Sequence, residues 1–548
     1  MTPAQLGDVI VAALNSLVDS GEISLDEVPQ AVTVERPRNR DHGDYATNVA
    51  LQLAKRSGMN PRDFATRLQA RLQECEGIDK VDIAGPGFLN ITVSAQAQGK
   101  ITDDIVAAGA AYGATDGLAG TKVNVEFISA NPTGPLHLGH TRWAVVGDAL
   151  ARVLAKAGAE VTREFYINDR GNQMDLFGAS LEAAALGKPV PEGGYQGDYI
   201  KDLAAEIVAA EPSIVDLAAE ERMMAFREKG YALQLAQQQS QLDGFNTHFD
   251  VWFSERSLHD AVAQTLESLR DQGHLFDDDG ALWMRTTDAG DDKDRVLIRS
   301  NGELTYFASD TAYYLNKRER GFDLCIYLLG ADHHGYVGRL KAMAACAGDD
   351  PERNIEVLIG QLVKIFQDGE ELKLSKRAGT IVSLEELVDL IGVDALRYTL
   401  ARYPADSPLT LDVAEMTKQA SDNPVFYVQY AHARLASILR NAGDLGLTPQ
   451  SHPELLTHER EGELLRALAE FPRIVASAAQ LREPHRIARY LEETASSFHK
   501  FYDACRVLPM GDEDADPTHL ARLQLVAATK VVFANGLDLL GVSAPERM

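Results

Sequence analysis

The fold is decided by one stretch of the sequence, residues 123–154, which reads V-N-V-E-F-I-S-A-N-P-T-G-P-L-H-L-G-H-T-R-W-A-V-V-G-D-A-L-A-R-V-L. Apolar and polar residues alternate over 123–127, which is the period of a β-strand. A cluster of Asn, Pro and Gly at 131–135 then interrupts regular structure. Apolar residues recur at helical spacing over 140–154. The stretch therefore predicts a buried strand, a tight turn and a long helix.

This strand–turn–helix unit is suited to binding phosphate. The start of a helix offers unpaired backbone N–H groups and the positive end of the helix dipole. Gly139 has no side chain, so a ligand can approach the backbone closely. His137 and His140 stand three positions apart, so both can face the same ligand. The sequence thus predicts a phosphate site at this turn.

Length and composition indicate a soluble protein with several domains. The chain has 548 residues, of which 45% are hydrophobic and 24% are charged, and this length suggests two to four domains. Its four cysteines are scattered without C-x-x-C spacing, which predicts no structural zinc and a reducing, cytoplasmic environment. A basic start followed by an apolar core is absent, as is any run of about 18 apolar residues, so neither a signal peptide nor a membrane span is expected.

The charge balance complicates any nucleic-acid function. There are 53 basic and 81 acidic residues, a net charge of −28, which by itself argues against RNA binding because phosphate contacts need Lys and Arg. Local patches nevertheless decide binding. The segment R-P-R-N-R at 36–40 places three arginines in five positions. It is either a solvated loop or a loop that contacts phosphate, and both interpretations stay open.

The chain divides into three predicted parts. Residues 1–110 combine a helical pattern with two short strands and form a small α/β domain. Residues 120–405 alternate strands and helices, with polar clusters at strand ends, as in a Rossmann-like parallel sheet. Within this part, residues 180–290 are charged and predict a mostly helical insertion. Residues 411–548 predict a helical bundle, so the fold class is multidomain α/β plus all-α.

Polar clusters after strand-like runs locate the ligand edge of the predicted sheet. N-D-R-G-N-Q at 168–173 and G-A-D-H-H-G-Y at 330–336 both follow such runs. Residues 296–299 and 304–310 also have strand-like patterns and are assigned to the same sheet. Because the carboxyl ends of parallel strands meet at one edge, we expect these clusters to lie close together.

Two short motifs carry a resemblance to a known family. L-H-L-G-H at 136–140 resembles the histidine–x–glycine–histidine signature of class I aminoacyl-tRNA synthetases. K-L-S-K-R at 373–377 resembles their second signature, a lysine–x–serine–lysine–serine loop. Each motif alone arises easily by chance. Both motifs in this order, with the first in a strand–turn–helix unit, are much more specific.

Further motifs narrow the resemblance to the arginyl-tRNA synthetase family. The lead-in F-I-S-A-N-P-T-G-P to the first signature is similar to that family's version. D-H-G-D-Y-A-T-N-V-A at 41–50 resembles its N-terminal tRNA-contacting domain. D-A-L-R at 394–397 matches the letters for which its anticodon-binding domain is named, and P-E-R-M at 545–548 matches its usual chain end. The resemblance covers essentially the whole chain and is weakest over 180–290.

The resemblance implies ATP-dependent ligation of L-arginine to tRNA(Arg) through an arginyl-adenylate. Protein side chains would act on phosphate oxygens by position and charge. The implied catalytic residues are His137, His140, Lys373 and Lys376. The implied ATP-binding residues are Ala130, Pro132, Thr133, Gly134, Pro135, Leu136, Leu138, Gly139 and Ser375. For each lysine, a solvated surface charge is the alternative, and Arg377 replaces the family's usual final serine.

Arginine as a substrate makes its own demand on the protein. A guanidinium group is planar and always charged, and carboxylates bind it bidentately. Tyr306 and Asp310 match the family's tyrosine–x3–aspartate pair, and Asn131 matches the asparagine that holds the substrate's backbone end. A turn role for Asn168 and a metal-ligand role for His333 remain alternatives. The implied arginine-binding residues are Asn131, Tyr306, Asp310, Asn168, Asp332 and His333.

The resemblance also implies contacts with tRNA. Aromatic residues at helical spacing can be core residues or can stack on single-stranded bases, and both interpretations stay open for the bundle. The family pattern further implies Mg²⁺ accompanying ATP, a monomer and no membrane partner. Another class I synthetase is one alternative, although the sequence shows neither a long editing insertion nor zinc ligands. A non-catalytic tRNA-binding relative is the other, although both signatures are intact. The implied tRNA-binding residues are Arg36, Arg38, Tyr427, Tyr430 and Met548.

Overall fold

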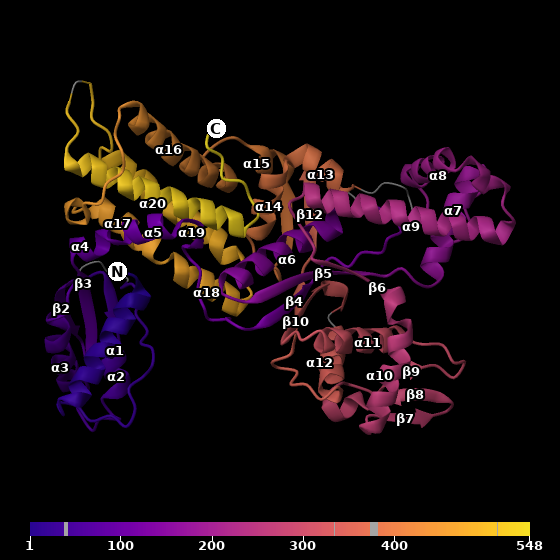
Figure 1. The fold of residues 1–548 in the computed structure, drawn as a ribbon, viewed down its shortest axis with the longest axis horizontal. Coiled ribbons are helices and arrows are strands. Elements are labelled where there is room, and N and C mark those ends of the chain that lie inside the picture. Colours follow the sequence, from indigo (N-terminus) through magenta and orange to yellow (C-terminus); the bar gives the residue numbers. More distant parts are fainter. Residues whose placement is uncertain (38–41, 334, 373–381, 512) are drawn as a thin grey trace.

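The computed structural model describes residues 1–37, 42–333, 335–372, 382–511 and 513–548. The molecule is elongated (Figure 1): a small N-terminal domain lies beneath one end of a helical bundle, a parallel sheet occupies the centre, and two lobes extend from the other side. In this part of the chain, no helix has both the length and the apolar character needed to cross a membrane.

The N-terminal domain is a small α/β unit, as predicted. Its three antiparallel strands, in the order β1-β3-β2, share a buried core with its helices. The predicted strands flank the turn at Gly85–Gly87. The elements are α1 (Pro3–Asp19), β1 (Tyr45–Thr47), α2 (Val49–Leu53), α3 (Pro61–Gln73), β2 (Ile78–Ala84) and β3 (Phe88–Val93).

The central part is a five-stranded parallel sheet, which confirms the Rossmann-like expectation. Its strand order is β11-β10-β4-β5-β6, and every neighbouring pair is parallel. The strands are β4 (Lys122–Glu126), β5 (Glu160–Ile167), β6 (Val251–Ser254), β10 (Leu324–Gly330) and β11 (Ile355–Gly360). The helices packed on it are α6 (Leu138–Lys156), α11 (Tyr306–Glu319) and α12 (Tyr336–Cys346).

The alternating sequence of β4 has an unexpected cause. Val123 and Val125 join the buried cluster that includes α6, as an amphipathic strand requires. The polar residues Asn124 and Glu126, which alternate with them, are also buried, because the other face of the sheet carries a polar layer. There, Asn124 Nδ2 donates to Glu164 Oε2 at 3.0 Å, and Lys317 Nζ of α11 donates to Glu126 Oε2 at 2.7 Å.

The predicted helical insertion at 180–290 is wrong as a single unit. A helical lobe ends at Gly244, and the chain then returns to the sheet as β6, which pairs with β5. A second lobe follows, with one helix and an antiparallel sheet of β7, β8 and β9. The strand V-W-F-S is only four residues long, so its pattern does not stand out from charged helical surroundings. The elements are α7 (Asn172–Ala185), α8 (Asp198–Ala210), α9 (Ala219–Gly244), α10 (His259–Asp271), β7 (Leu275–Asp278), β8 (Ala281–Met284) and β9 (Arg295–Ile298).

Two segments predicted as strands of the central sheet do not belong to it. Residues 296–299 contribute to β9 in the antiparallel sheet of the second lobe. Residues 304–310 enter α11, whose N-cap is Thr305: its hydroxyl accepts a hydrogen bond from Ala308 N at 3.4 Å. The short L-T-Y-F-A-S-D segment contains Leu, Thr, Tyr and Phe, which also occur in strands, but this cap and the buried positions beyond Asp310 select a helix.

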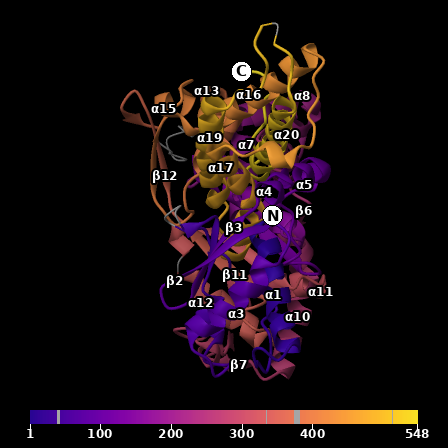
Figure 2. The same ribbon diagram turned by 90° about the vertical axis from the view of Figure 1, so that its left-hand side faces the viewer.

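The C-terminal part is a helical bundle, as predicted (Figure 2). Residues 459–481 form two helices that divide at Glu470, because Pro472 has no backbone N–H and its ring clashes with the carbonyl four residues earlier in a continuous helix. Shorter elements connect the bundle to the sheet. The elements are β12 (Val363–Gln367), β13 (Glu370–Glu371), α13 (Leu384–Ile391), α14 (Val393–Ala401), β14 (Leu409–Asp412), α15 (Val413–Thr417), α16 (Pro424–Asp444), α17 (Glu459–Ala469), α18 (Phe471–Leu481), α19 (His485–Ala504) and α20 (Pro517–Leu539).

The bundle also receives the segment after the N-terminal domain. Helix α5 (Ile101–Ala108) packs against α20, and Tyr112 OH donates to Leu468 O at 2.8 Å. On the domain side, Arg466 Nη1 donates to Asp44 Oδ1 at 2.7 Å. The bundle therefore contacts both the N-terminal domain itself, through Asp44, and the segment that follows this domain in the sequence.

Candidate functional site

The two signature histidines stand together at the start of α6. His137 is the N-cap residue, and its Nδ1 accepts a hydrogen bond from Gly139 N at 3.1 Å. His140 Nδ1 accepts from His137 N at 3.2 Å. The two rings stack with centroids 3.9 Å apart. With Nδ1 of each ring accepting, a proton on Nε2 makes each ring a donor, which is the role that a phosphate ligand requires.

The backbone just before the turn is strained. Ile128 and Ser129 have φ values of 71° and 41°, which cost of the order of 1–3 kcal/mol each for residues other than glycine. Ser129 Oγ donates to Glu126 Oε1 at 3.0 Å and accepts from Tyr166 N at 3.2 Å. These hydrogen bonds fix the path that carries the chain from β4 to the signature turn.

The predicted ATP-binding residues of the first signature form one continuous segment with two kinds of position. Gly134, Pro135 and Gly139 are half-buried and therefore reach the surface of the turn. The remaining residues are buried and shape it; they are Ala130, Pro132, Thr133, Leu136 and Leu138.

The helical lobe braces this segment from outside, which the sequence did not predict. Gln238 Nε2 of α9 donates to Asn131 O at 3.1 Å and to Gly134 O at 2.8 Å. Tyr199 OH of α8 donates to Thr133 O at 3.2 Å. Gln238 is fully buried. A buried glutamine between charged helices carries no motif, so only the folded chain reveals this support.

The second signature lies outside the described residues, and this includes Lys373, Ser375 and Lys376. The chain beyond it is placed, however. Ser383 forms a β-bridge with His137, and Leu384 N donates to Leu136 O at 2.8 Å. Ser383 also caps α13 in a capping box with Glu386. The segment that carries the second signature is therefore attached at its end to the first signature.

A cavity of about 230 Å³ lies at the end of β4. Two predicted arginine-binding residues, Tyr306 and Asp310, line it one helical turn apart, and His333 lines it from the end of β10. The sequence did not predict the other lining residues, because the tyrosines have core-like patterns and Glu126 occupies a polar position of a strand that looks amphipathic. The further lining residues are Glu126, Tyr166, Tyr313, Tyr327, Leu329, Tyr336 and Leu340.

The cavity is prepared for a positive charge. Burial, together with the nearby carboxylates of Glu126 and Glu255, raises the pKa of Asp310 to about 7, while Arg339 opposes them. Burial likewise raises the pKa of Glu255, mainly against the influence of Arg170. A cationic ligand would relieve this crowding of carboxylates.

The wall of the cavity is fixed by a buried ionic network. Lys317 Nζ, which pairs with Glu126, lies 4.3 Å and 3.9 Å from the ring centroids of Tyr313 and Tyr327. Tyr313 OH donates to Glu164 Oε1 at 2.6 Å. The carboxylate and the rings that face the cavity therefore have little freedom to move.

Two other predicted arginine-binding residues, Asn131 and Asn168, lie outside the lining of this cavity. Asn131 Nδ2 donates to Gln173 Oε1 at 2.6 Å. Asn168 is half-buried where β5 ends. Its neighbour Asp169 is buried and accepts hydrogen bonds from Tyr231, Ser254 and Arg256, which is a structural role. Asp332 lies in the single helical turn after β10, beside His333.

The predicted tRNA contacts are distributed over two surfaces. Arg36 is exposed in the N-terminal domain, and Arg38 lies outside the described residues. In the bundle, Tyr430 and Met548 line one cavity of about 390 Å³, and both are exposed. Tyr427 is half-buried, with its ring 5.1 Å from that of His499. Tyr430 is thus the more exposed of the two rings, and Tyr427 is half-buried beside His499.

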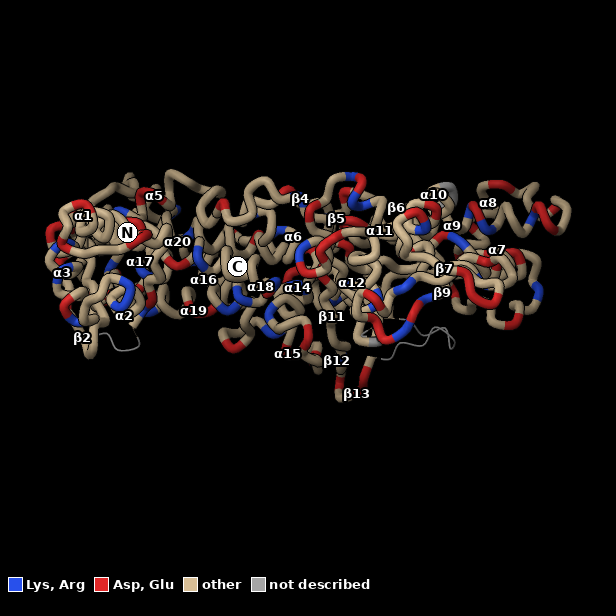
Figure 3. Tube along the Cα trace, turned by 90° about the horizontal axis from the view of Figure 1, so that it is seen from below, with Lys and Arg blue, Asp and Glu red and all other residues tan. Residues whose placement is uncertain are grey.

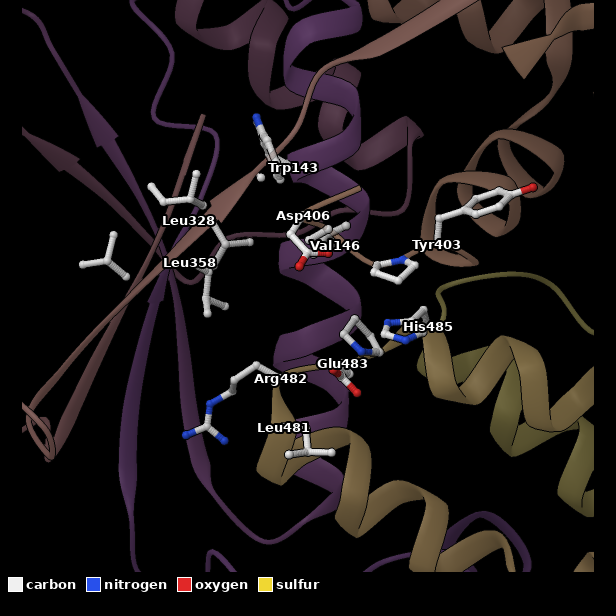
Figure 4. Close-up of a pocket in the computed structure, with 16 residues that line it drawn as sticks. Trp143, Val146, Leu328, Leu358, Tyr403, Asp406, Leu481, Arg482, Glu483 and His485 are labelled. Carbon is white, nitrogen blue, oxygen red and sulfur yellow. The ribbon is translucent and has the colours of Figure 1, made fainter. Parts of the chain in front are cut away.

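A further cavity, of about 270 Å³, lies away from these residues (Figure 4). It is bounded by Trp143 and Val146 of α6, Leu358 of β11 and the turn between α18 and α19, which contributes Arg482. No predicted site residue whose side chain the structure describes lines it. It is a junction between the sheet and the bundle.

Comparisons with known proteins agree with this geometry. Three family models match: the arginyl tRNA synthetase N terminal domain over residues 4–93, the class I (R) tRNA synthetase catalytic domain over 104–402, and the DALR anticodon binding domain over 428–548.

Full-length relatives are similar along the whole chain. Proteins named arginine–tRNA ligase from Paenarthrobacter aurescens strain TC1 and Frankia alni are each 57% identical, with 100% of both chains covered. The structure of Thermus thermophilus arginyl-tRNA synthetase shares the fold, with a TM-score of 0.76 at 24% identity and 100% of both chains covered. The matched family models, the relatives and the fold lead to one conclusion: the chain belongs to the arginyl-tRNA synthetase family.

Proposed function

We propose that this protein is an arginine–tRNA ligase that activates L-arginine with ATP and transfers it to tRNA(Arg). The observation that carries the proposal is the carboxylate- and tyrosine-lined cavity at the end of β4, directly before the first signature. A guanidinium group fits it, since Asp310 supplies a carboxylate and Tyr306 supplies an aromatic wall. This cavity lies at the end of the strand that leads into the first signature, which supports an amino-acid pocket beside a phosphate-binding turn.

In the first step, an arginine carboxylate oxygen attacks the α-phosphorus of ATP. A new oxygen–phosphorus bond forms while the bond to pyrophosphate breaks, which gives arginyl-adenylate. Little covalent chemistry is asked of the protein, so positioning and charge stabilisation dominate. His137 and His140 donate hydrogen bonds to phosphate oxygens, and Lys373 and Lys376 add positive charge as the negative charge develops. Asn131 holds the backbone end of the substrate.

In the second step, a terminal ribose hydroxyl of the tRNA attacks the acyl carbon, loses its proton and displaces AMP. By family resemblance, the acceptor is the 2′-hydroxyl, and activation itself requires bound tRNA. Residues 1–110 and 411–548 hold the tRNA, and residues 120–405 carry the chemistry. Arg36, Arg38, Tyr427, Tyr430 and Met548 are the proposed RNA contacts.

Several finer features belong to the same proposal. Mg²⁺ accompanies ATP and is held through phosphate oxygens, which are the hard oxygen ligands that this ion prefers. The protein works as a cytoplasmic monomer.

Attachment of radiolabelled amino acids to total tRNA tests the proposal. Only arginine is expected to become acid-precipitable, and only with ATP present. Charging with a different amino acid would assign the chain to another class I specificity. Failure to charge purified tRNA(Arg) would favour a non-catalytic tRNA-binding relative.

A further inference from the structure

The motif D-A-L-R at 394–397 lies outside residues 428–548, which match the DALR anticodon binding domain. Residues 394–397 belong to α14 and fall within the matched catalytic domain, which ends at 402, whereas the anticodon-domain match begins at 428. We propose that Asp394 and Arg397 are positioning residues that couple tRNA binding on the bundle to the alignment of the two signature segments. This inference rests on the proposed function.

Arg397 joins three separate parts of the molecule. Its guanidinium is fully buried and forms an ion pair with Asp148 of α6, which is also fully buried. Its Nη1 donates to Phe245 O at 2.9 Å and to Thr247 Oγ1 at 2.8 Å, just after α9. Its Nε donates to Leu540 O at 3.2 Å, at the end of α20. One side chain thus links the signature helix, the helical lobe and the bundle.

The approach of the bundle to this guanidinium is close. A Cβ atom added to Gly541 would lie 2.1 Å from Arg397 Nη2. A displacement of the chain at 540–541 is therefore transmitted to Arg397, because no space is available to absorb it.

Asp394 makes the matching contact one turn earlier on α14. Its Oδ1 accepts a hydrogen bond from Ser543 N at 2.9 Å, and its Oδ2 accepts from Gln429 Nε2 at 2.8 Å and from the Ser543 hydroxyl. Gln429 Nε2 also donates to Ser543 O at 3.0 Å. This carboxylate therefore holds α16 and the C-terminal segment together.

These contacts reach the proposed anticodon surface. Gln429 precedes Tyr430 on α16, and a cavity of about 560 Å³ is lined by Asp394, Gln429, Phe426 and Met548. RNA that moves Met548 or the aromatic residues of α16 therefore acts directly on the partners of Asp394.

At its other end, α14 is connected to the first signature and to the chain that follows the second signature. Helix α14 follows α13 after the single residue Gly392, and α13 begins after Ser383, which bridges to His137. Asp148, the partner of Arg397, is in the helix that starts after His137. A shift of α14 would therefore move α13 with its bridge from Ser383 to His137. Through Asp148, it would also move the helix that begins at the first signature.

Kinetics with altered tRNA tests the coupling. ATP–pyrophosphate exchange with arginine is measured with intact tRNA(Arg) and with the same tRNA carrying a substituted anticodon, which gives a kcat ratio for each protein. In Asp394→Ala this ratio is expected to fall by about tenfold, a typical size for coupling between two sites. The loss appears in kcat with intact tRNA, while KM for that tRNA stays within about twofold. Asp394 is only half-buried, so this variant should fold.

Arg397→Lys provides a second variant, which keeps the charge beside Asp148 but cannot reach all its acceptors. The matched control is Glu492→Gln. It weakens the ion pair in which Arg402 Nε, at the C-cap of α14, lies 2.7 Å from Glu492 Oε1 of α19. This pair touches neither α6 nor residues 540–543. The control should leave the ratio unchanged.

The proposal is overturned by any of three results: a wild-type ratio of one, an unchanged ratio in Asp394→Ala, or an equal loss in Glu492→Gln. A merely structural role would lower activity with both RNAs together and keep the ratio. Absence of arginine-dependent exchange in the wild type would overturn the proposed function itself.

Discussion

Asp310 is the residue on which substrate choice depends. Its carboxyl group is crowded by burial and by Glu126 and Glu255, so the pKa is raised to about 7 in the empty pocket. A guanidinium binds the ionised form, which means that binding releases a proton wherever Asp310 was protonated. Substrate affinity should therefore depend on pH near neutrality.

We predict that the Kd for arginine rises by about tenfold when the pH is lowered from 8 to 6, since one proton must then leave a group with a pKa near 7. Isothermal titration calorimetry in two buffers measures the affinity and the released proton. Asp310→Asn should bind arginine weakly and without this pH dependence. An affinity that stays constant across the range would contradict the assignment.

A second prediction concerns Lys376. Its charge acts as negative charge develops on the phosphate, so Lys376→Ala should lower kcat roughly 10²–10³-fold and change ATP affinity little. Stopped-flow measurement of adenylate formation separates the two. Arg377→Ser, which restores the family's usual residue, is the matched control and should remain close to wild type. Equal losses of rate and ATP affinity in Lys376→Ala would argue against a transition-state role.

At this scale, the sequence identifies residues whose motif is read directly. Tyr306 and Asp310 were assigned to the pocket by resemblance, and the structure places both in its lining. Glu126 and Gln238 were not found. Glu126 occupies the polar position of a strand that looks amphipathic, and a buried polar layer cannot be distinguished from a solvated face by alternation alone.

At the scale of elements, the packing of α6 on β4 sets the position of the signature turn. Gly147 makes this possible, because a Cβ atom there would lie 2.3 Å from the Phe127 ring. Alanine normally favours a helix over glycine by up to about 1 kcal/mol, so packing and propensity have opposite signs at this position.

We predict that Gly147→Ala lowers stability by about 1–3 kcal/mol, because overpacking outweighs helix propensity. Thermal unfolding measures the effect. Gly443→Ala in α16 is the matched control, since a Cβ atom there meets no other atom within 4 Å, and it should be neutral or stabilising. A stabilised Gly147→Ala would show that α6 does not need this close approach.

The elements that the sequence predicts well are long and amphipathic, as α1 and the bundle helices show. The errors fall on short segments. Strand β6 has four residues, and the segment 304–310 that leads into α11 contains several residues common in strands. Contacts in the folded chain decide both structures. Strand β6 is fixed by pairing with β5, and the start of α11 is fixed by the cap at Thr305.

For the whole molecule, the net charge of −28 has to coexist with RNA binding. Basic and acidic positions are interspersed along the length of the chain (Figure 3). Many of the arginines are engaged in internal contacts, such as Arg397 with Asp148 and Arg320 with Glu164. Local surfaces rather than the overall charge must therefore bind tRNA, and composition alone is a poor guide to this function.

The central claim is that a carboxylate pocket and two signature segments form one arginine-activating site. ATP–pyrophosphate exchange in the presence of tRNA(Arg), with arginine compared against citrulline, tests it most directly. Citrulline has nearly the same shape but a neutral ureido group. Arginine should support exchange with a kcat/KM roughly 10⁴-fold higher, because the neutral analogue leaves buried carboxylates unpaired. Comparable exchange with citrulline, or none with arginine, would contradict the account.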